Sequence, residues 1–150
     1  MYRNLIDLFK ENEGKGAVGA FNVHCFEMLP AMVRAAEELG VPVILQTSLG
    51  TARYIGFEPL IAAVKAIAEK SAVSVALHMD HCKDIDALKE AIDKGYSSVM
   101  YDGSSLSLEE NIKNTKEVVA YAHERNVSVE GEVGSIGGAE EGVVLSLIHI

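Results

Sequence analysis

The sequence predicts an α/β fold built on a parallel β-sheet, and it favours a (β/α) barrel over a doubly wound sheet. Five segments rich in Val, Ile, Leu and Ala alternate with stretches of helical periodicity. The connections between them are short, which implies right-handed crossovers and parallel strands. One face of the strands is polar, and this favours the barrel because helices cover both faces of a doubly wound sheet.

The five strand segments lie at fairly regular intervals along the chain, at residues 17–23, 41–48, 73–80, 97–102 and 127–133. In the fifth, Ser128, Glu130 and Glu132 alternate with small and apolar residues, so the carboxylates share one face. In the third, His78 and Asp80 likewise share a face. A barrel allows an inner face of this kind to carry a site at its rim.

Each gap between strands predicts one helix, and a short amphipathic helix is expected within residues 1–12. Gly40, Gly95 and Asn126 stand where helices should end, and Asp84 and Ser107 where two should begin. Nothing with the composition of a linker interrupts the pattern, so we expect residues 1–150 to form a single domain. The residues at helical spacing are Leu29, Met32, Val33 and Ala36; Leu60, Val64 and Ile67; Ile85, Leu88 and Ile92; and Ile112, Thr115, Val119 and Ala122.

Composition excludes several classes of protein. The net charge is -9 and the basic residues are scattered, so a nucleic acid is not expected as a partner. The apolar runs are far shorter than the roughly 20 residues that span a bilayer, so no membrane span is expected. The first residues lack the apolar segment of a secretory signal, which predicts a cytoplasmic protein. Cys25 and Cys82 lack CxxC spacing and are expected to be reduced thiols.

Polar side chains follow the ends of the predicted strands, where a barrel brings catalytic groups to one mouth. They are Asn22, Ser48, Asp80 with His81, Asp102, and Glu130 with Glu132. Buried carboxylates cost several kcal/mol each unless they are paired or bind a cation. The basic residues close by in sequence are Arg53 and Lys83, so a divalent metal held by His81, Asp102 and Glu132 is the simpler prediction.

Each of these assignments has an ordinary structural alternative. Asp80 with His81 could be a helix N-cap and its neighbour, although Asp84 is better placed to cap. Glu130 and Glu132 could both be solvated on an exposed edge strand. His78 is expected to be a hydrogen-bonded core histidine, and the other histidines, His24, His123 and His149, are expected at the surface.

Several motifs in one order resemble the class II fructose-bisphosphate and tagatose-bisphosphate aldolases, from about residue 5 to about residue 144. They are Gly19-Ala20-Phe21-Asn22, Val43-Ile44-Leu45-Gln46-Thr47-Ser48, His78-Met79-Asp80-His81-Cys82, Tyr101-Asp102-Gly103-Ser104, Glu109-Glu110-Asn111, and Val129-Glu130-Gly131-Glu132-Val133-Gly134 followed by Gly137-Gly138. Each piece alone is weak, but their order makes the resemblance specific.

The resemblance implies a zinc-dependent (β/α)8 TIM barrel that splits a ketose bisphosphate into dihydroxyacetone phosphate and an aldehyde. By match of motif, Asp80 corresponds to the catalytic acid/base and His81 to one of three zinc histidines. Asp102 and Glu132 correspond to ligands of a second or alternate metal position. Ser48 and Asn22 correspond to substrate-contacting positions, and Glu140 to a proton-transfer carboxylate in a mobile loop.

The resemblance also implies that the chain holds about the first five β/α units of the barrel. The family would continue after Glu141 with two more zinc histidines, a glycine-rich loop and a phosphate site, so we expect this chain to be an inactive fragment. Residues 145–150 are interpreted as a possible non-native tail, because codons for them can reproduce a sequencing-library adapter. A phosphosugar substrate and a homodimer or homotetramer are expected of the full-length protein. A non-catalytic partner subunit and another metal-dependent barrel lyase remain as alternatives.

Overall fold

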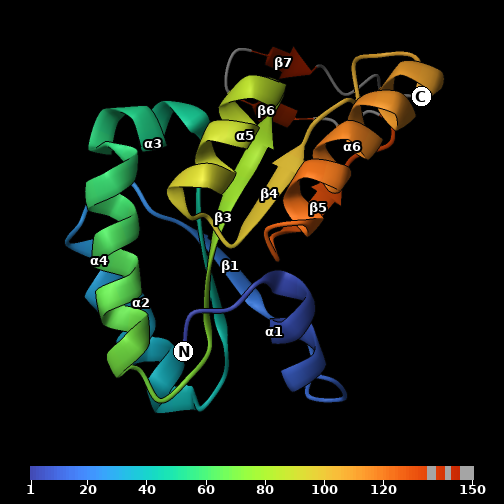
Figure 1. The fold of residues 1–150 in the computed structure, drawn as a ribbon. Coiled ribbons are helices and arrows are strands. Elements are labelled where there is room, and N and C mark those ends of the chain that lie inside the picture. Colours follow the sequence, from blue (N-terminus) through green and yellow to red (C-terminus); the bar gives the residue numbers. More distant parts are fainter. Residues whose placement is uncertain (135–137, 141–142, 146–150) are drawn as a thin grey trace.

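The structure is a computed structural model that describes residues 1–134, 138–140 and 143–145. Five parallel strands form one sheet in the order β1-β2-β3-β4-β5 (Figure 1). Each strand lies beside its neighbours in the chain, as in a barrel wall, with none of the reversal of order that marks a doubly wound sheet. The strands are β1 (Gly19–Asn22), β2 (Val43–Thr47), β3 (Val75–Cys82), β4 (Ser98–Tyr101) and β5 (Ser128–Gly131).

Within the described ranges, six helices accompany the sheet, and a short antiparallel pair of strands follows it. The helices are α1 (Leu5–Glu11), α2 (Met28–Leu39), α3 (Leu49–Ile55), α4 (Phe57–Lys70), α5 (Ile85–Lys94) and α6 (Leu108–His123), and the pair is β6 (Gly138–Glu140) with β7 (Val143–Leu145). None of these helices is long and apolar enough to cross a membrane. Leu145 ends β7, and residues 146–150 of the expected tail lie outside the described residues.

The gap between β2 and β3 holds two helices, so the expectation of one helix in each gap was wrong. Ser48 starts α3 by accepting a hydrogen bond from the Thr51 amide at 3.2 Å. Gly56 ends it with φ of 91°, and its amide donates to the Ala52 carbonyl. A glycine tolerates this backbone conformation, so α4 can start in a new direction at once. Helix α3 and its cap place Arg53 and Ser48 at the carboxyl ends of the strands.

The other predicted helix ends are largely confirmed. Asp84 accepts hydrogen bonds from the Asp86 and Ala87 amides at the start of α5, and Ser107 accepts one from Glu110 at the start of α6. Left-handed glycines end α2 at Gly40 and α5 at Gly95. Asn126 is also left-handed, with φ of 58°, but lies two residues beyond the cap of α6 at Glu124.

The two faces of the sheet have different partners. The face toward α2, α4, α5 and α6 forms the main apolar core, and its strand residues include Val43, Leu45, Val75, Leu77, Met79 and Val99. On the opposite face, Leu5 and Leu8 of α1 pack against Ile44 and Ala76. Helix α1 therefore closes the amino-terminal end of this face, and polar residues occupy its carboxyl-terminal end.

Candidate active site

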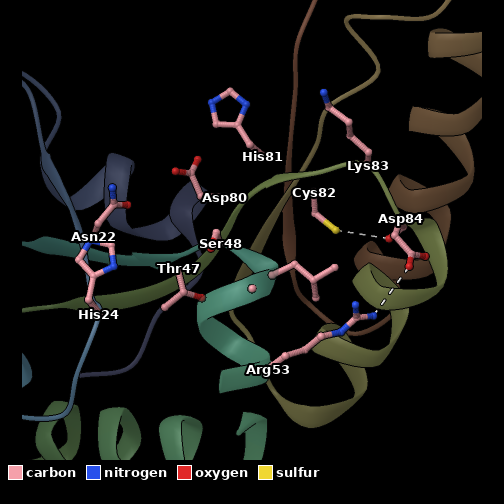
Figure 2. A pocket seen from close by; sticks show the side chains of 12 residues that line it. Asn22, His24, Thr47, Ser48, Arg53, Asp80, His81, Cys82, Lys83 and Asp84 are labelled. Atoms are coloured by element: carbon pink, nitrogen blue, oxygen red, sulfur yellow. Dashed lines mark hydrogen bonds and ion pairs between the residues drawn. The ribbon is translucent and has the colours of Figure 1, made fainter. Parts of the chain in front are cut away.

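The carboxyl ends of β1, β2 and β3 border a cavity of about 620 Å³ (Figure 2). This volume lies within the range of sites for small molecules. Four of the seven residues predicted as site residues line it. Its lining comprises Asn22, His24, Thr47, Ser48, Leu49, Gly50, Arg53, Asp80, His81, Cys82, Lys83 and Asp84.

His81, Asp102 and Glu132 converge beside this cavity, as the sequence predicted. One ligand atom from each lies within 4.8 Å of the others. The His81 Nδ1 atom is 3.3 Å from Glu132 Oε2 and 3.7 Å from Asp102 Oδ2. These residues come from the ends of three neighbouring strands, so the barrel topology itself builds the cluster.

The backbone of His81 is adapted to this position. The register between β3 and β4 shifts between Met79 and Cys82, and His81 has φ of 45°. A left-handed backbone at a residue other than glycine costs on the order of 1–3 kcal/mol and persists where surrounding contacts impose it. The irregularity lets both Asp80 and the next residue, His81, face the cavity, which a regular alternating strand would forbid.

Asp102 is fixed by hydrogen bonds on one oxygen and faces positive charge with the other. Its Oδ1 atom accepts bonds from the Ser104 amide at 3.0 Å and from Ser104 Oγ at 2.6 Å. Its Oδ2 atom lies 3.4 Å from Lys83 Nζ. Burial disfavours the charged carboxylate and raises its pKa. The hydrogen bonds from Ser104 and the positive charge of Lys83 outweigh this effect and hold the pKa of Asp102 below its ordinary value.

The donor set fits a divalent cation. The side chains of Asp102 and Glu132 are 0% and 8% exposed, and two buried carboxylates side by side require positive charge. One imidazole nitrogen and two carboxylate oxygens are suitable ligands for zinc, and three protein ligands leave a position open for substrate. The solvated alternative for Glu132 is therefore wrong.

Asp80 lies next to this cluster and has a partner that sequence reasoning missed. Gln46 Nε2 on β2 donates a hydrogen bond of 2.7 Å to Asp80 Oδ2, which orients the carboxylate at the cavity. A lone glutamine within an apolar strand gives little signal by itself. Gln46 lies two residues after Ile44, so both side chains lie on the face of β2 opposite the main core. This position was the observation that could have identified Gln46 as a site residue.

Glu130 does not join the metal cluster. Its Oε2 atom lies 3.5 Å from His78 Nε2, and its side chain is 54% exposed. Desolvation, together with the Asp80 carboxylate, raises the pKa of Glu130 above its ordinary value. His78 is a buried core histidine, as expected: its Nδ1 atom and Ser98 Oγ share a hydrogen bond of 2.8 Å, and burial lowers its pKa to about 4.

The remaining predicted positions differ in how directly the structure describes them. Ser48 and Asn22 line the cavity, and the Ser48 hydroxyl also caps α3. Glu140, expected in a loop, belongs to β6, but its side chain lies outside the described part of the chain. The surface position expected of His149 lies outside it as well. Cys25 and Cys82 are free thiols, as expected.

Comparisons with known proteins agree with this geometry. The family model described as "Fructose-bisphosphate aldolase class-II" matches residues 4–148. A 6-phospho-5-dehydro-2-deoxy-D-gluconate aldolase from Halalkalibacterium halodurans is 47% identical, over 91% of this chain and 49% of that protein. A fructose-bisphosphate aldolase from Geobacillus stearothermophilus is 48% identical, over 87% of this chain and 47% of that protein.

Solved structures give the same result. A putative fructose-1,6-bisphosphate aldolase from Coccidioides immitis superposes with a TM-score of 0.83 at 33% identity, covering 94% of this chain and 50% of that one. The YdjI aldolase from Escherichia coli K12 superposes with a TM-score of 0.82 at 33% identity, covering 89% of this chain and 51% of that one. The chain thus spans about half the length of the relatives it matches. With the family model covering nearly all of it, the chain belongs to the class II fructose-bisphosphate aldolase family.

Proposed function

We propose that this chain forms the first five β/α units of a zinc-dependent aldolase barrel. The full-length protein would cleave fructose-1,6-bisphosphate or tagatose-1,6-bisphosphate into dihydroxyacetone phosphate and glyceraldehyde 3-phosphate. The observation that carries the proposal is that Asp80 and His81 line one cavity while Asp102 and Glu132 meet His81 beside it. In this proposal residues 1–150 are one partial barrel domain with a non-native tail from residue 145.

The roles within the metal cluster follow the resemblance to the family. His81 would hold the catalytic zinc together with two histidines from the rest of the barrel, and Asp102 and Glu132 would hold a second or alternate divalent metal. A bound cation would act as a Lewis acid that polarises the substrate oxygens and stabilises the negative charge developing during carbon–carbon cleavage. Lys83, 3.4 Å from Asp102, balances part of the carboxylate charge.

Asp80 is the proposed acid/base. It adjoins a metal ligand, so it can reach a hydroxyl of a substrate that the metal positions and take its proton. The hydrogen bond from Gln46 keeps the Asp80 carboxylate in that orientation. Ser48 and Asn22 would contact the substrate from the cavity wall, and Glu140 would supply the second proton-transfer carboxylate.

A second substrate class has specific support. One relative at 47% identity is named for 6-phospho-5-dehydro-2-deoxy-D-gluconate, so that compound belongs in the same substrate screen as the two ketose bisphosphates. A non-catalytic partner subunit would have no need for Asp80 and His81, and another barrel lyase would turn over none of these three substrates. For the full-length protein the proposal also includes a cytoplasmic location, a role in glycolysis and assembly into a homodimer or homotetramer.

The test compares this chain with a gene that encodes the complete barrel. A coupled assay for dihydroxyacetone phosphate should detect turnover by the zinc-loaded full-length enzyme and negligible turnover by the chain of 150 residues. Asp80→Ala should lower kcat of the full-length enzyme by roughly 10²–10⁴-fold, the usual contribution of a general acid/base. Turnover by the full-length enzyme that Asp80→Ala leaves unchanged would contradict the assignment of Asp80.

A further inference from the structure

Asn111 is buried between two parts of the metal cluster, although the proposed mechanism gives it no role. It lies on α6, four residues after the capping Ser107, and is 6% exposed. Its Nδ2 atom donates a hydrogen bond of 2.7 Å to the Glu132 carbonyl. Its Oδ1 atom accepts one of 3.0 Å from Thr115 Oγ1. Thr115 on the same helix thus fixes the Asn111 amide, and the amide in turn fixes the backbone of Glu132.

The same amide also touches the chain that follows Asp102. A Cβ atom built on Gly103 would lie 2.3 Å from Asn111 Oδ1 and 2.5 Å from Asn111 Cγ. Since real Cβ atoms do not approach so closely, only glycine lets the backbone after β4 pass this side chain. Asn111 is therefore in contact with the neighbour of Asp102 on one side and with Glu132 on the other.

We propose that Asn111 is a positioning residue that sets the placement of the Asp102 and Glu132 carboxylates for a divalent cation. The inference rests on the proposed function insofar as this cluster binds metal. Glu132 follows the last residue of β5, Gly131, and the bond from Asn111 on α6 holds its carbonyl just beyond the end of the strand. Groups that orient metal ligands without touching the metal commonly change metal affinity by about 10–100-fold when removed.

Matched substitutions on α6 separate positioning from general support of the helix. Asn111→Leu keeps the approximate volume but removes the donor to Glu132. Asn114→Leu is the control, because Asn114 Nδ2 donates a comparable bond of 2.8 Å to Tyr101 Oη but has no bond to Glu132. Thermal melting of the metal-free proteins measures the structural effect of each change separately.

The readout is zinc affinity of the chain of 150 residues, measured by competition with a chromophoric chelator, together with the visible spectrum of bound Co²⁺. We expect zinc affinity to fall by about 10–100-fold in Asn111→Leu and to stay within about two-fold in Asn114→Leu. The Co²⁺ spectrum should change only in Asn111→Leu. An Asn111→Leu protein that melts earlier yet binds zinc as the starting chain does would overturn the inference, since a purely structural role gives that result.

A double substitution adds an independent check. Gly103→Ala should weaken zinc binding because its new methyl group displaces the Asn111 amide. In an Asn111→Ala background the same change should have little further effect, since the closest clashing atoms are gone; fully additive losses would overturn the inference. If the starting chain shows no zinc binding that depends on Asp102 and Glu132, their assignment as metal ligands fails and this inference fails with it. Zinc binding that depends on these two carboxylates but not on Asn111 overturns the positioning role alone.

Discussion

Two histidines three residues apart on β3 show how position in one strand fixes the chemistry of a side chain. His78 lies within the regular part of the strand, is 2% exposed and shares a hydrogen bond with Ser98. His81 follows the register shift, and its side chain is 34% exposed beside the cavity. The first is therefore suited to a neutral structural role, and the second to binding a ligand.

The first prediction at this scale concerns acid stability. The pKa of His78 falls from 6.5 to about 4 on burial, so between these pH values the unfolded chain binds a proton that the folded chain does not. The contribution of neutral His78 to the free energy of unfolding is fully present above pH 6.5 and decreases as the pH falls toward 4. It amounts to roughly 3 kcal/mol in total. Urea unfolding of the metal-free chain should show this loss, and His78→Gln should remove most of it.

The control is His123→Gln, which removes an exposed imidazole. Glu130 acts in the opposite direction, because its raised pKa favours the folded state at low pH and that contribution is lost as the pH rises. If His78→Gln and His123→Gln give the same dependence of unfolding free energy on pH, His78 is not the group responsible.

The sequence located the residues of the candidate site better than the residues that hold them in place by hydrogen bonds. Asp80, His81, Asp102 and Glu132 could be located because polar residues at the ends of apolar strands are conspicuous. Gln46 and Asn111 could not be assigned roles in this way. Their roles depend on hydrogen bonds to residues 34 and 21 positions away in the chain, and no local pattern specifies those partners.

Among the elements, the strands were predicted more accurately than the helices. Apolar composition located β1 to β5, although β3 continues past residue 80 to Cys82 through the register shift. Helix α3 was missed because its seven residues include Gly50 and lack an extended apolar repeat. The start of α6 at Leu108 was predicted from its cap Ser107 and not from the apolar periodicity, which begins only at Ile112; acidic residues favour its first turn. The pair β6 and β7 was also missed.

The start of α5 allows a quantitative prediction at this scale. Asp84 accepts hydrogen bonds of 3.0 and 3.1 Å from two amides of the first turn. Asp84→Ala should therefore lower the free energy of unfolding by about 1 kcal/mol, within the range of 0.5–2 for N-caps. Denaturation by urea, followed by circular dichroism, measures the change.

Asp84 also lies 3.9 Å from Arg53, and both side chains are more than half exposed. An exposed pair of this kind contributes little, so Arg53→Ala should change the unfolding free energy far less than Asp84→Ala. Equal losses in the two variants would show that the ion pair, and not the cap, supports the helix.

At the scale of the whole molecule, the decisive feature is a parallel sheet whose first and last strands each have one neighbouring strand among the described residues. Among the described residues, β1 pairs with β2 alone and β5 with β4 alone, and all four residues of β1 are exposed. The sequence predicted these five units from periodicity, and the relatives of twice the length indicate what a complete barrel requires. Edge strands that present free backbone groups can pair with another chain.

The last prediction is that the chain of 150 residues self-associates through β1. Phe21 on this edge is 52% exposed, and Tyr54 on α3 is 86% exposed. Phe21→Lys and Tyr54→Lys add the same charge and remove an aromatic ring of similar size, but only the first places a lysine on the edge strand, where charge opposes pairing. Sedimentation velocity over a range of concentrations should show association in the starting chain and in Tyr54→Lys, and a marked reduction in Phe21→Lys. An equal reduction in both variants would assign the association to exposed aromatic surface in general, because the β1 edge is unchanged in Tyr54→Lys.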